Sequence, residues 1–238
     1  MPVMPPVAVP ACLGSLEHEV KYIVPAAAGP SLAAWLGGVC RPERAYPPAR
    51  VVTVYFDTPD LALLGEKIDS DYLKQKMRVR WYAPLDGPGR GPAFAEVKRR
   101  VGNRRDKPRM PLPVDASELE RWRLDDPRWL ALAETVARGE LGAGRNLSPV
   151  LRLTYTRRRF VEPQGTARVV LDTGIAATAA HPRIGGQVPA LLDLAVLEAK
   201  GASAELPPVL RPVVRFGARR GAMSKYLACY LAVTGTVL

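Results

Sequence analysis

The chain has 238 residues, 47% of them hydrophobic, which is enough to bury a substantial core in one large β-rich domain or two small ones. Its formal net charge of +11 indicates an anionic partner, such as nucleic acid, a membrane surface or phosphates. No segment approaches the roughly 20 apolar residues that span a bilayer, and the three scattered cysteines lack metal-ligand spacing, so we expect no membrane span and reduced thiols.

The first predicted segment, residues 1–14, is a disordered proline-rich arm. Its opening, Met1–Pro10, lacks the basic region of a secretory signal, so we expect the protein to work in the cytoplasm. No internal repeat and no break in composition divides the rest of the chain. Residues 15–238 are therefore predicted to form a single domain.

A strand is predicted at Leu16–Val24, where two acids and a lysine alternate with mostly apolar residues. Side chains along a strand point alternately to its two faces, so Glu17, Glu19 and Lys21 share one face while Val20 lies on the other. A solvent-facing strand could carry this pattern alone. The pattern becomes informative because it recurs farther along the chain.

Strands and helices alternate in the rest of the predicted order, with turns at segments rich in glycine and proline. The first half is predicted to contain a helix at Ser31–Val39, a strand at Val51–Asp57, a helix capped by Thr58 with Pro59 at its first position, strands at Leu73–Tyr82 and Phe94–Arg100 around a turn at Pro84–Pro92, and a basic loop at Val101–Arg109. The second half is predicted to contain a helix with Ser117 and Glu120 as a capping box, a helix opened by Asp126 that ends near Gly139, strands at Pro149–Glu162, Arg168–Ile175 and Leu191–Lys200, and helices at Pro208–Phe216 and from Ser224 onward.

Charged faces recur along the predicted strands. The charged face is basic on Leu73–Tyr82, and it carries both signs on Phe94–Arg100 and Leu194–Lys200. The side chains concerned are Lys74, Lys76, Arg78, Arg80, Glu96, Lys98, Arg100, Glu198 and Lys200. Strands with one charged and one apolar face predict a sheet whose polar face is a binding site. If that sheet closes into a barrel, the charges line a tunnel suited to a polyanion and its metal ions.

An ordered series of motifs runs from residue 16 to about residue 232. It begins with Glu17-His18-Glu19-Val20-Lys21, an E-x-E-x-K strand, and ends with Ser224-Lys225-Tyr226. Between them follow Tyr55-Phe56-Asp57-Thr58-Pro59-Asp60-Leu61, Lys76-Met77-Arg78-Val79-Arg80, Glu96-Val97-Lys98-Arg99-Arg100, Tyr155-Thr156-Arg157, Arg168-Val169-Val170-Leu171-Asp172 and Glu198-Ala199-Lys200. This series resembles the VTC domain, the polyphosphate polymerase branch of the CYTH or triphosphate tunnel metalloenzyme superfamily.

The resemblance implies an α+β fold: a closed antiparallel β-barrel, the triphosphate tunnel, with helical insertions and a C-terminal helix. It implies catalytic phosphate ligands at Lys21, Arg78, Arg80, Lys98, Arg157, Arg168 and Lys225, with Tyr155 and Lys200 as further substrate-binding residues. Arginine suits this role because its fork meets two phosphate oxygens at once. Mn²⁺ or Mg²⁺ would be held by the hard oxygens of Glu198, supported by Glu17 and Glu19.

The activity implied by the resemblance is transfer of the γ-phosphoryl group of ATP to a growing inorganic polyphosphate chain. The intact E-x-E-x-K strand is typical of inorganic or nucleoside triphosphate hydrolases, which form the first alternative. A polyphosphate- or RNA-binding barrel without turnover is the second, although nucleic acid is disfavoured because Tyr22 and Trp81 lie opposite the charged faces. Polyphosphate export would need a separate membrane partner, and release into the cytosol is the simpler expectation.

Several of these residues also allow a purely structural reading. Arg78 and Arg80 could pair with Glu96 on a surface strand, and Lys225 could be a surface lysine of the C-terminal helix. In the run Arg157–Arg159, at most one or two side chains can face a lumen because neighbours on a strand point to opposite faces.

Overall fold

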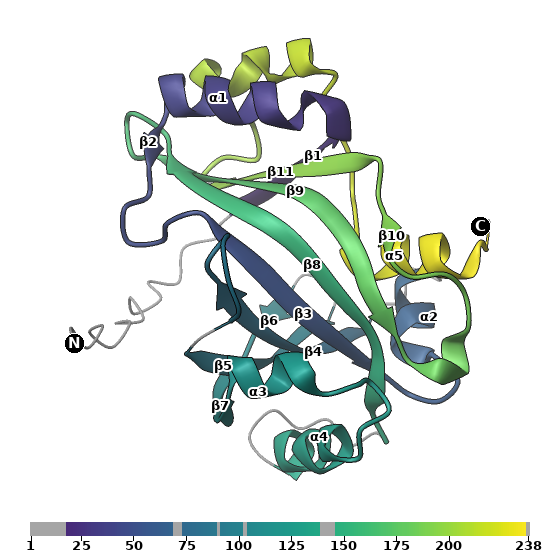
Figure 1. Ribbon diagram of the computed structural model, residues 1–238. Coiled ribbons are helices and arrows are strands. Elements are labelled where there is room, and N and C mark those ends of the chain that lie inside the picture. The colour runs from purple at the N-terminus through teal and green to yellow at the C-terminus, as the bar shows by residue number, and fades with distance from the viewer. Residues whose placement is uncertain (1–17, 69–72, 90, 102–103, 139–145, 237–238) are drawn as a thin grey trace, which may run out of the picture.

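The computed structural model describes residues 18–68, 73–89, 91–101, 104–138 and 146–236 (Figure 1). The predicted proline-rich arm and Glu17 lie outside these residues. In the part of the chain that is described, no helix is long and apolar enough to cross a bilayer.

Strands dominate the fold. They are β1 (His18–Pro25), β2 (Arg41–Pro42), β3 (Ala49–Asp57), β4 (Leu73–Ala83), β5 (Pro92–Val101), β6 (Arg104–Asp106), β7 (Arg109–Asp115), β8 (Ser148–Val161), β9 (Ala167–Ala180), β10 (Ala190–Leu191), β11 (Leu194–Gly201) and β12 (Arg219–Arg220). The helices are α1 (Gly29–Val39), α2 (Ala62–Ile68), α3 (Ala116–Arg121), α4 (Arg128–Arg138) and α5 (Lys225–Thr234), with 3-10 turns η1 (Ala26–Ala28), η2 (Pro182–Ile184) and η3 (Pro208–Phe216).

The described strands form one 12-stranded sheet in the order β12-β1-β11-β9-β8-β3-β4-β5-β6, with β10 beside β9, β2 beside β8 and β7 beside β5. Neighbouring strands pair antiparallel throughout, including the expected hairpin of β4 and β5. The predicted α+β class with a C-terminal helix is therefore confirmed.

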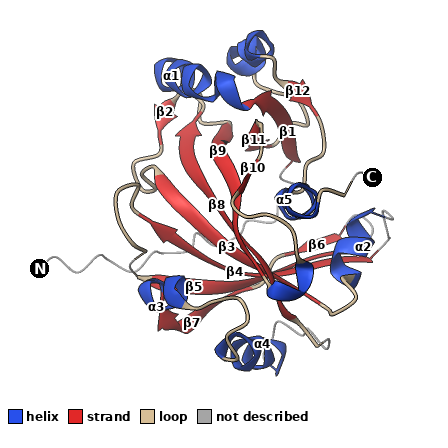
Figure 2. Cartoon of the chain, turned by 45° about the vertical axis from the view of Figure 1, so that its right-hand side comes forward, coloured by secondary structure: helices blue, strands red, loops and turns tan. Residues whose placement is uncertain are grey.

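The predicted closed barrel is wrong, because the sheet formed by the described strands stays open (Figure 2). The outer edge of β1 pairs with the short strand β12, and that of β5 pairs with β6 and β7, so no pairing joins the two ends. Pro111 and Pro113 in β7 lack the backbone N–H that a further ladder would need. The sheet instead coils. Its upper half in Figure 1, with β1, β9 and β11, faces its lower half, with β3, β4 and β5, across a hollow beside α5.

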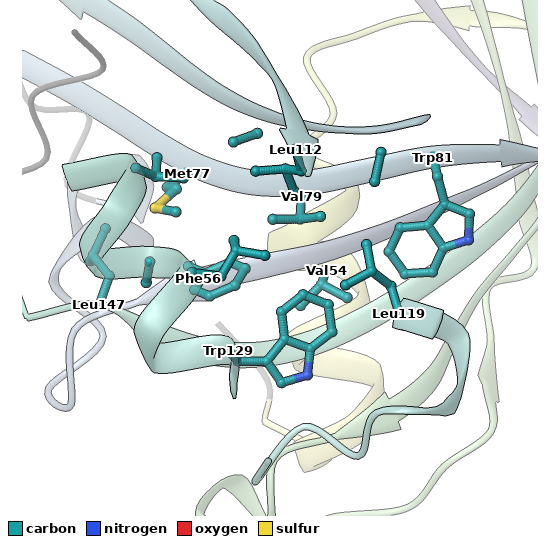
Figure 3. Packing of buried hydrophobic residues seen from close by; sticks show 14 of the residues in the cluster. Val54, Phe56, Met77, Val79, Trp81, Leu112, Leu119, Trp129 and Leu147 are labelled. Atoms are coloured by element: carbon teal, nitrogen blue, oxygen red, sulfur yellow. The ribbon is translucent and has the colours of Figure 1, made fainter. Parts of the chain in front are cut away.

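The outer face of the lower half carries the largest core cluster (Figure 3). Met77, Val79 and Trp81 of β4 are all 0% exposed and pack with residues of β3 and β5 against α3 and α4. Trp129 of α4 lies in the same cluster, with its ring edge toward Phe56. Burying one such side chain stabilises the fold by roughly 1.5–3 kcal/mol. Because alternate side chains of a strand point to opposite faces, burial of this apolar face under the helices turns the charged face of β4 inward.

The outer face of the upper half is covered by α1 and η3. Leu32 and Leu36 of α1 and Leu210 of η3 are buried against Val20 and Leu197 of the sheet. The apolar half of the alternating pattern in β1 and β11 therefore points outward into a helical layer, and the charged half points inward.

The helix that follows β3 begins later than predicted. No helix begins at Pro59; α2 begins at Ala62, after a turn, and the Thr58 hydroxyl accepts the Ala62 N–H at 2.9 Å. The buried Asp57 carboxylate accepts the N–H of Leu63 at 2.8 Å, because a helix start leaves amides unpaired and favours a negative charge.

Two further local predictions are corrected. The α3 cap is Asp115, whose carboxylate accepts the Ser117 N–H at 2.8 Å, so Ser117 is already helical. The basic segment Val101–Arg109 was predicted to be a loop, but part of it forms β6, which pairs with the end of β5. By contrast, the C-terminal helix begins where it was predicted, with Ser224 as the cap of α5.

Candidate functional site

The hollow between the two halves of the sheet is a cavity of about 550 Å³ closed on one side by the start of α5. Lysines and arginines dominate its wall, with far fewer carboxylates. The charged residues lining it are Glu19, Lys21, Lys74, Lys76, Arg78, Arg80, Lys98, Arg100, Lys107, Arg157, Glu198, Lys200, Arg220 and Lys225. A concave site with this excess of positive charge suits a small polyanion.

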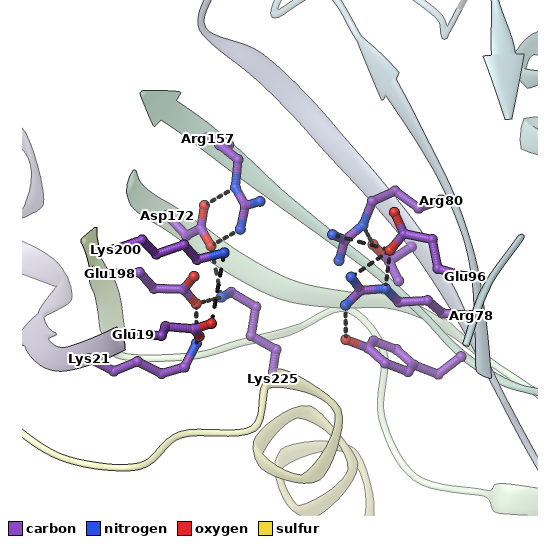
Figure 4. Close-up of polar contacts among 12 residues, drawn as sticks. Glu19, Lys21, Arg78, Arg80, Glu96, Arg157, Asp172, Glu198, Lys200 and Lys225 are labelled. Atoms are coloured by element: carbon purple, nitrogen blue, oxygen red, sulfur yellow. Dashed lines mark hydrogen bonds and ion pairs between the residues drawn. The ribbon is translucent and has the colours of Figure 1, made fainter. Parts of the chain in front are cut away.

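One wall is built by cross-strand charge pairs between β1 and β11. Lys21 lies opposite Glu198, and Glu19 lies opposite Lys200. The Lys21 ammonium sits between two carboxylates: it is 2.6 Å from Glu19 Oε1 and also donates to Glu198 Oε1 (Figure 4). Lys200 Nζ is 3.8 Å from Glu19 Oε2.

The same wall continues to Asp172 on β9, which is 0% exposed. Arg157 meets this carboxylate with both ends of its fork, at 2.7 Å from Nε to Oδ1 and 2.6 Å from Nη2 to Oδ2. Lys225 Nζ is 2.8 Å from Asp172 Oδ2 and 3.8 Å from Glu198 Oε1. The start of α5 is thereby tied electrostatically to two strands of the sheet.

The opposite wall holds a second group of charges on β4 and β5. Arg78 lies opposite Glu96 in the hairpin, and its Nε donates to Glu96 Oε2 at 2.7 Å. Arg80 Nη1 is 3.9 Å from the same carboxylate oxygen, and its Nε donates to Thr53 Oγ1 at 3.0 Å. The two arginines are thus paired with Glu96 and also line the cavity, so the surface-strand alternative for them does not apply.

Tyr155 lies at the centre of the cavity wall between the two groups. The Nζ of Lys225 lies 5.2 Å from its ring centroid, and the guanidinium carbons of Arg157 and Arg80 lie 5.4 and 6.0 Å from it. Its hydroxyl is buried and has no hydrogen-bond partner within the described chain. A buried hydroxyl without a partner costs free energy, so its position among these cations calls for a polar partner.

Proton affinities follow from these pairs. Burial acts to raise the pKa of Glu198, but Lys21 and Lys225 outweigh burial and hold this pKa well below its usual range. Burial alone would lower the pKa of Lys225, and the Asp172 carboxylate raises it instead. Burial likewise acts to raise the pKa of Glu96, but Arg78 lowers it to about 2. These pairs therefore keep Lys225 charged and Glu198 and Glu96 ionised, whereas burial and the neighbouring Arg78 lower the pKa of Lys107 to about 8.

Removing the Glu96 charge should change how stability depends on pH. The folded-state pKa of about 2 lies below the usual glutamate pKa of 4.5, so ionised Glu96 stabilises the fold above pH 4.5 and loses its effect as the pH falls toward 2. The shift corresponds to roughly 3 kcal/mol. Between about pH 5 and about pH 2, the free energy of unfolding should fall more for the wild type than for Glu96→Gln, as measured by urea titration. Parallel curves for the two proteins would contradict the assignment.

The carboxylates of the cavity fit a divalent ion that is shared with substrate. Among the residues described, no cluster of three or more His, Cys, Asp and Glu side chains could hold an ion alone. Mg²⁺, however, commonly binds through one or two carboxylates together with substrate phosphates. Glu198 and Glu19, bridged by the Lys21 ammonium, offer such a pair of hard oxygen ligands.

The structure brings most of the predicted site residues together, while their roles remain predictions. The lining includes Glu19, Lys21, Arg78, Arg80, Lys98, Tyr155, Arg157, Glu198, Lys200 and Lys225. Arg168 lies outside it: it is exposed near the start of β9, opposite Lys200, on the same face as Asp172. Glu17 lies outside the described residues.

Some residues of the cavity and of its charge pairs were not predicted. Asp172, buried behind the wall, was quoted only within a motif, although the turn at Gly165 sets a hairpin register that puts it opposite Arg157. Lys107, which lines the cavity, was assigned to a basic loop without a role. Tyr55 was read as part of a motif without a role, and its hydroxyl accepts from Arg78 at 3.5 Å.

A family model described as the VTC domain matches residues 16–234. No curated protein matches the sequence. The solved structure of a putative adenylyl cyclase from Hippeastrum, described as having a dominant triphosphatase activity, is 14% identical with a TM-score of 0.55, over 94% of this chain and 98% of that chain. A putative adenylate cyclase from Bacillus halodurans is 15% identical with a TM-score of 0.52, over 88% of this chain and 94% of that chain. At these identities, the likeness to the solved structures concerns the fold.

Proposed function

This chain belongs to the VTC domain family of the CYTH superfamily, and on that premise we propose that it is a polyphosphate polymerase. The reaction transfers the γ-phosphoryl group of ATP to the end of a growing inorganic polyphosphate chain. The observation that carries the proposal is the excess of cations along the cavity. Lys74, Arg100 and Lys107 line it in addition to the cations nearest the Asp172 and Glu96 carboxylates.

A hydrolase has to hold one triphosphate, whereas a polymerase must also hold the acceptor chain in line with the γ-phosphate. Lys74 and Lys76 extend the face of β4 that carries Arg78, and Arg100 extends that of Lys98 on β5. These additional cations would neutralise the acceptor phosphates. A site filled by two anionic chains also leaves little room for competing water.

The roles within the cavity follow from residue chemistry. Arg78, Arg80 and Arg157 would donate to phosphate oxygens through the guanidinium N–H groups that their protein partners leave free. Lys21 and Lys225 would neutralise charge as it moves to the leaving phosphate. Lys98, Lys200 and Tyr155 would extend the binding surface. A divalent ion, held by Glu198 and Glu19, would supply charge neutralisation between neighbouring phosphates when it is bound.

Triphosphate hydrolysis is the second candidate. Glu19 of the E-x-E-x-K strand faces the cavity together with Glu198 of β11, and an intact E-x-E-x-K strand is typical of hydrolases. The structurally similar Hippeastrum protein is described as having a dominant triphosphatase activity. In this reading, water takes the place of the acceptor phosphate, and the remaining roles are unchanged.

A product assay separates these functions. Purified protein is incubated with ATP and Mn²⁺, with and without a short polyphosphate primer, and ADP, orthophosphate and acid-labile polymer are measured. We expect ADP and long-chain polyphosphate, with the primer stimulating the rate. Arg78→Ala should abolish polymer formation, since it loses a charge-assisted contact worth roughly 1.5–3 kcal/mol in ground-state binding alone.

The other outcomes are equally informative. Orthophosphate formed in step with ADP, with no polymer at any primer concentration, would select the hydrolase. Binding of ATP or polyphosphate without any ADP would select a non-catalytic binding protein. Binding of RNA in preference to polyphosphate would contradict both enzymatic functions.

A further inference from the structure

The first turn of α5 contributes Ser224 and Lys225 to the cavity, and the next residue, Tyr226, is buried on another side of the helix. The Lys225 ammonium reaches Asp172 on β9 at 2.8 Å. Successive residues of a helix are about 100° apart around its axis, so the direction of Lys225 depends on how this turn is docked. The contacts that hold Tyr226 therefore affect where the Lys225 ammonium lies in the cavity.

Tyr226 is docked on Asp57, at the end of β3. Its hydroxyl donates to Asp57 Oδ2 at 2.9 Å. The Asp57 carboxylate is 0% exposed and also accepts the N–H groups of Thr58, Leu63 and Leu64 at 2.8, 2.8 and 3.0 Å. Because these amides fix its orientation, the carboxylate is a rigid acceptor for the hydroxyl.

An aromatic stack adds a second contact. The rings of Tyr226 and Tyr55 lie 4.8 Å apart at an angle of 7°. Tyr55 lines the cavity, and its hydroxyl accepts from Arg78 Nη1 at 3.5 Å. The stack thus joins α5, which carries Lys225, to Tyr55, which bonds Arg78 on the opposite wall of the cavity.

We propose that Tyr226 is a positioning residue: its hydrogen bond to Asp57 fixes the first turn of α5 and holds the Lys225 ammonium where a bound triphosphate meets it. The inference rests on the proposed function in one respect, that the cavity binds a triphosphate, and it holds for polymerase and hydrolase alike. A hydroxyl that acts through Lys225 loses its effect on binding once the ammonium is removed. A hydroxyl that only stabilises the fold does not.

The test is a double-mutant cycle on the full chain, with tripolyphosphate and Mg²⁺ as the probe and calorimetric titration as the measurement. Lys225→Ala should weaken binding by about tenfold or more, and Tyr226→Phe by about threefold to tenfold. The double variant should bind no more than about twofold more weakly than Lys225→Ala alone. Tyr230→Phe removes a hydroxyl from the same helix one turn later and should leave the affinity unchanged.

Losses that multiply in the double variant, or wild-type affinity in Tyr226→Phe, would overturn the positioning role. If Tyr226→Phe does not fold, Asp57→Asn weakens the same hydrogen bond and enters the same cycle with the same expectation. A wild-type chain that fails to bind tripolyphosphate would overturn this inference and the proposed function together. Tight wild-type binding with multiplying losses would overturn only the role of Tyr226.

Discussion

Glu198→Gln should reduce metal-dependent turnover by about a hundredfold to a thousandfold or more, while the protein keeps its fold. The side chain keeps its size, but the amide lacks the negative charge that a hard divalent ion requires. Metal stabilisation of the transferring phosphoryl group is worth several kcal/mol, which sets the size of the loss. Rates of ADP formation in Mn²⁺, with the thermal midpoint as a check on folding, measure the effect.

Tripolyphosphate binding should persist in Glu198→Gln, because Lys21, Lys225 and Arg157 remain in the wall. Glu162→Gln is the matched control: Glu162 is also a buried carboxylate, in the turn after β8, but it accepts from Thr166 and does not line the cavity. Near wild-type turnover of the Glu198 variant in Mn²⁺ would remove Glu198 as the metal ligand.

Arg157→Ala should lower kcat/KM by about two orders of magnitude or more, whereas Arg158→Ala should stay within about threefold of wild type. Arg157 lines the cavity, where the guanidinium N–H groups that Asp172 leaves free would meet phosphate oxygens, and a lost charge-assisted contact costs roughly 1.5–3 kcal/mol in binding. The further loss is expected in the transition state, where the same guanidinium stabilises charge on the transferred group.

The neighbouring arginine makes a stringent control for this experiment. Arg158 has the same chemistry and follows directly in β8, but alternation turns it to the other face, opposite Leu171 of the upper core. Equal losses in the two variants would show that total positive charge, and not the position of Arg157, determines activity. Steady-state kinetics with ATP and Mn²⁺ give both values.

The faces of individual strands could be read from the sequence. Lys76, Arg78 and Arg80 point into the cavity, and Met77 and Val79 into the core, as the period of two predicts. This information is local, since each side chain's face follows from its neighbours in the same strand. The hairpin of β4 and β5 was equally readable, because a short turn permits only antiparallel pairing.

Helix starts were predicted less well. Ser117 was assigned as a cap, but the Asp115 carboxylate accepts the free amide of α3. Thr58 does accept a free amide of α2, but at Ala62 and not next to Pro59, and the Asp57 carboxylate accepts the amides that follow. Several polar residues in a row can each cap a helix, and the backbone angles at that point decide among them. The sequence pattern identifies the region of a cap, with an error of a few residues.

The sequence by itself determined which side chains could form a basic, carboxylate-containing face and, through its ordered motifs, the family. Tertiary structure decided the partners: Lys21 and Glu198 are 177 positions apart, and no local period specifies such a pair. It also placed Lys107 in the cavity and Arg168 outside its lining, and it left the sheet open where a closed barrel was expected. The physical reason is that strand pairing, sheet twist and edge strands depend on contacts between distant segments, whereas alternation depends only on the geometry of one strand.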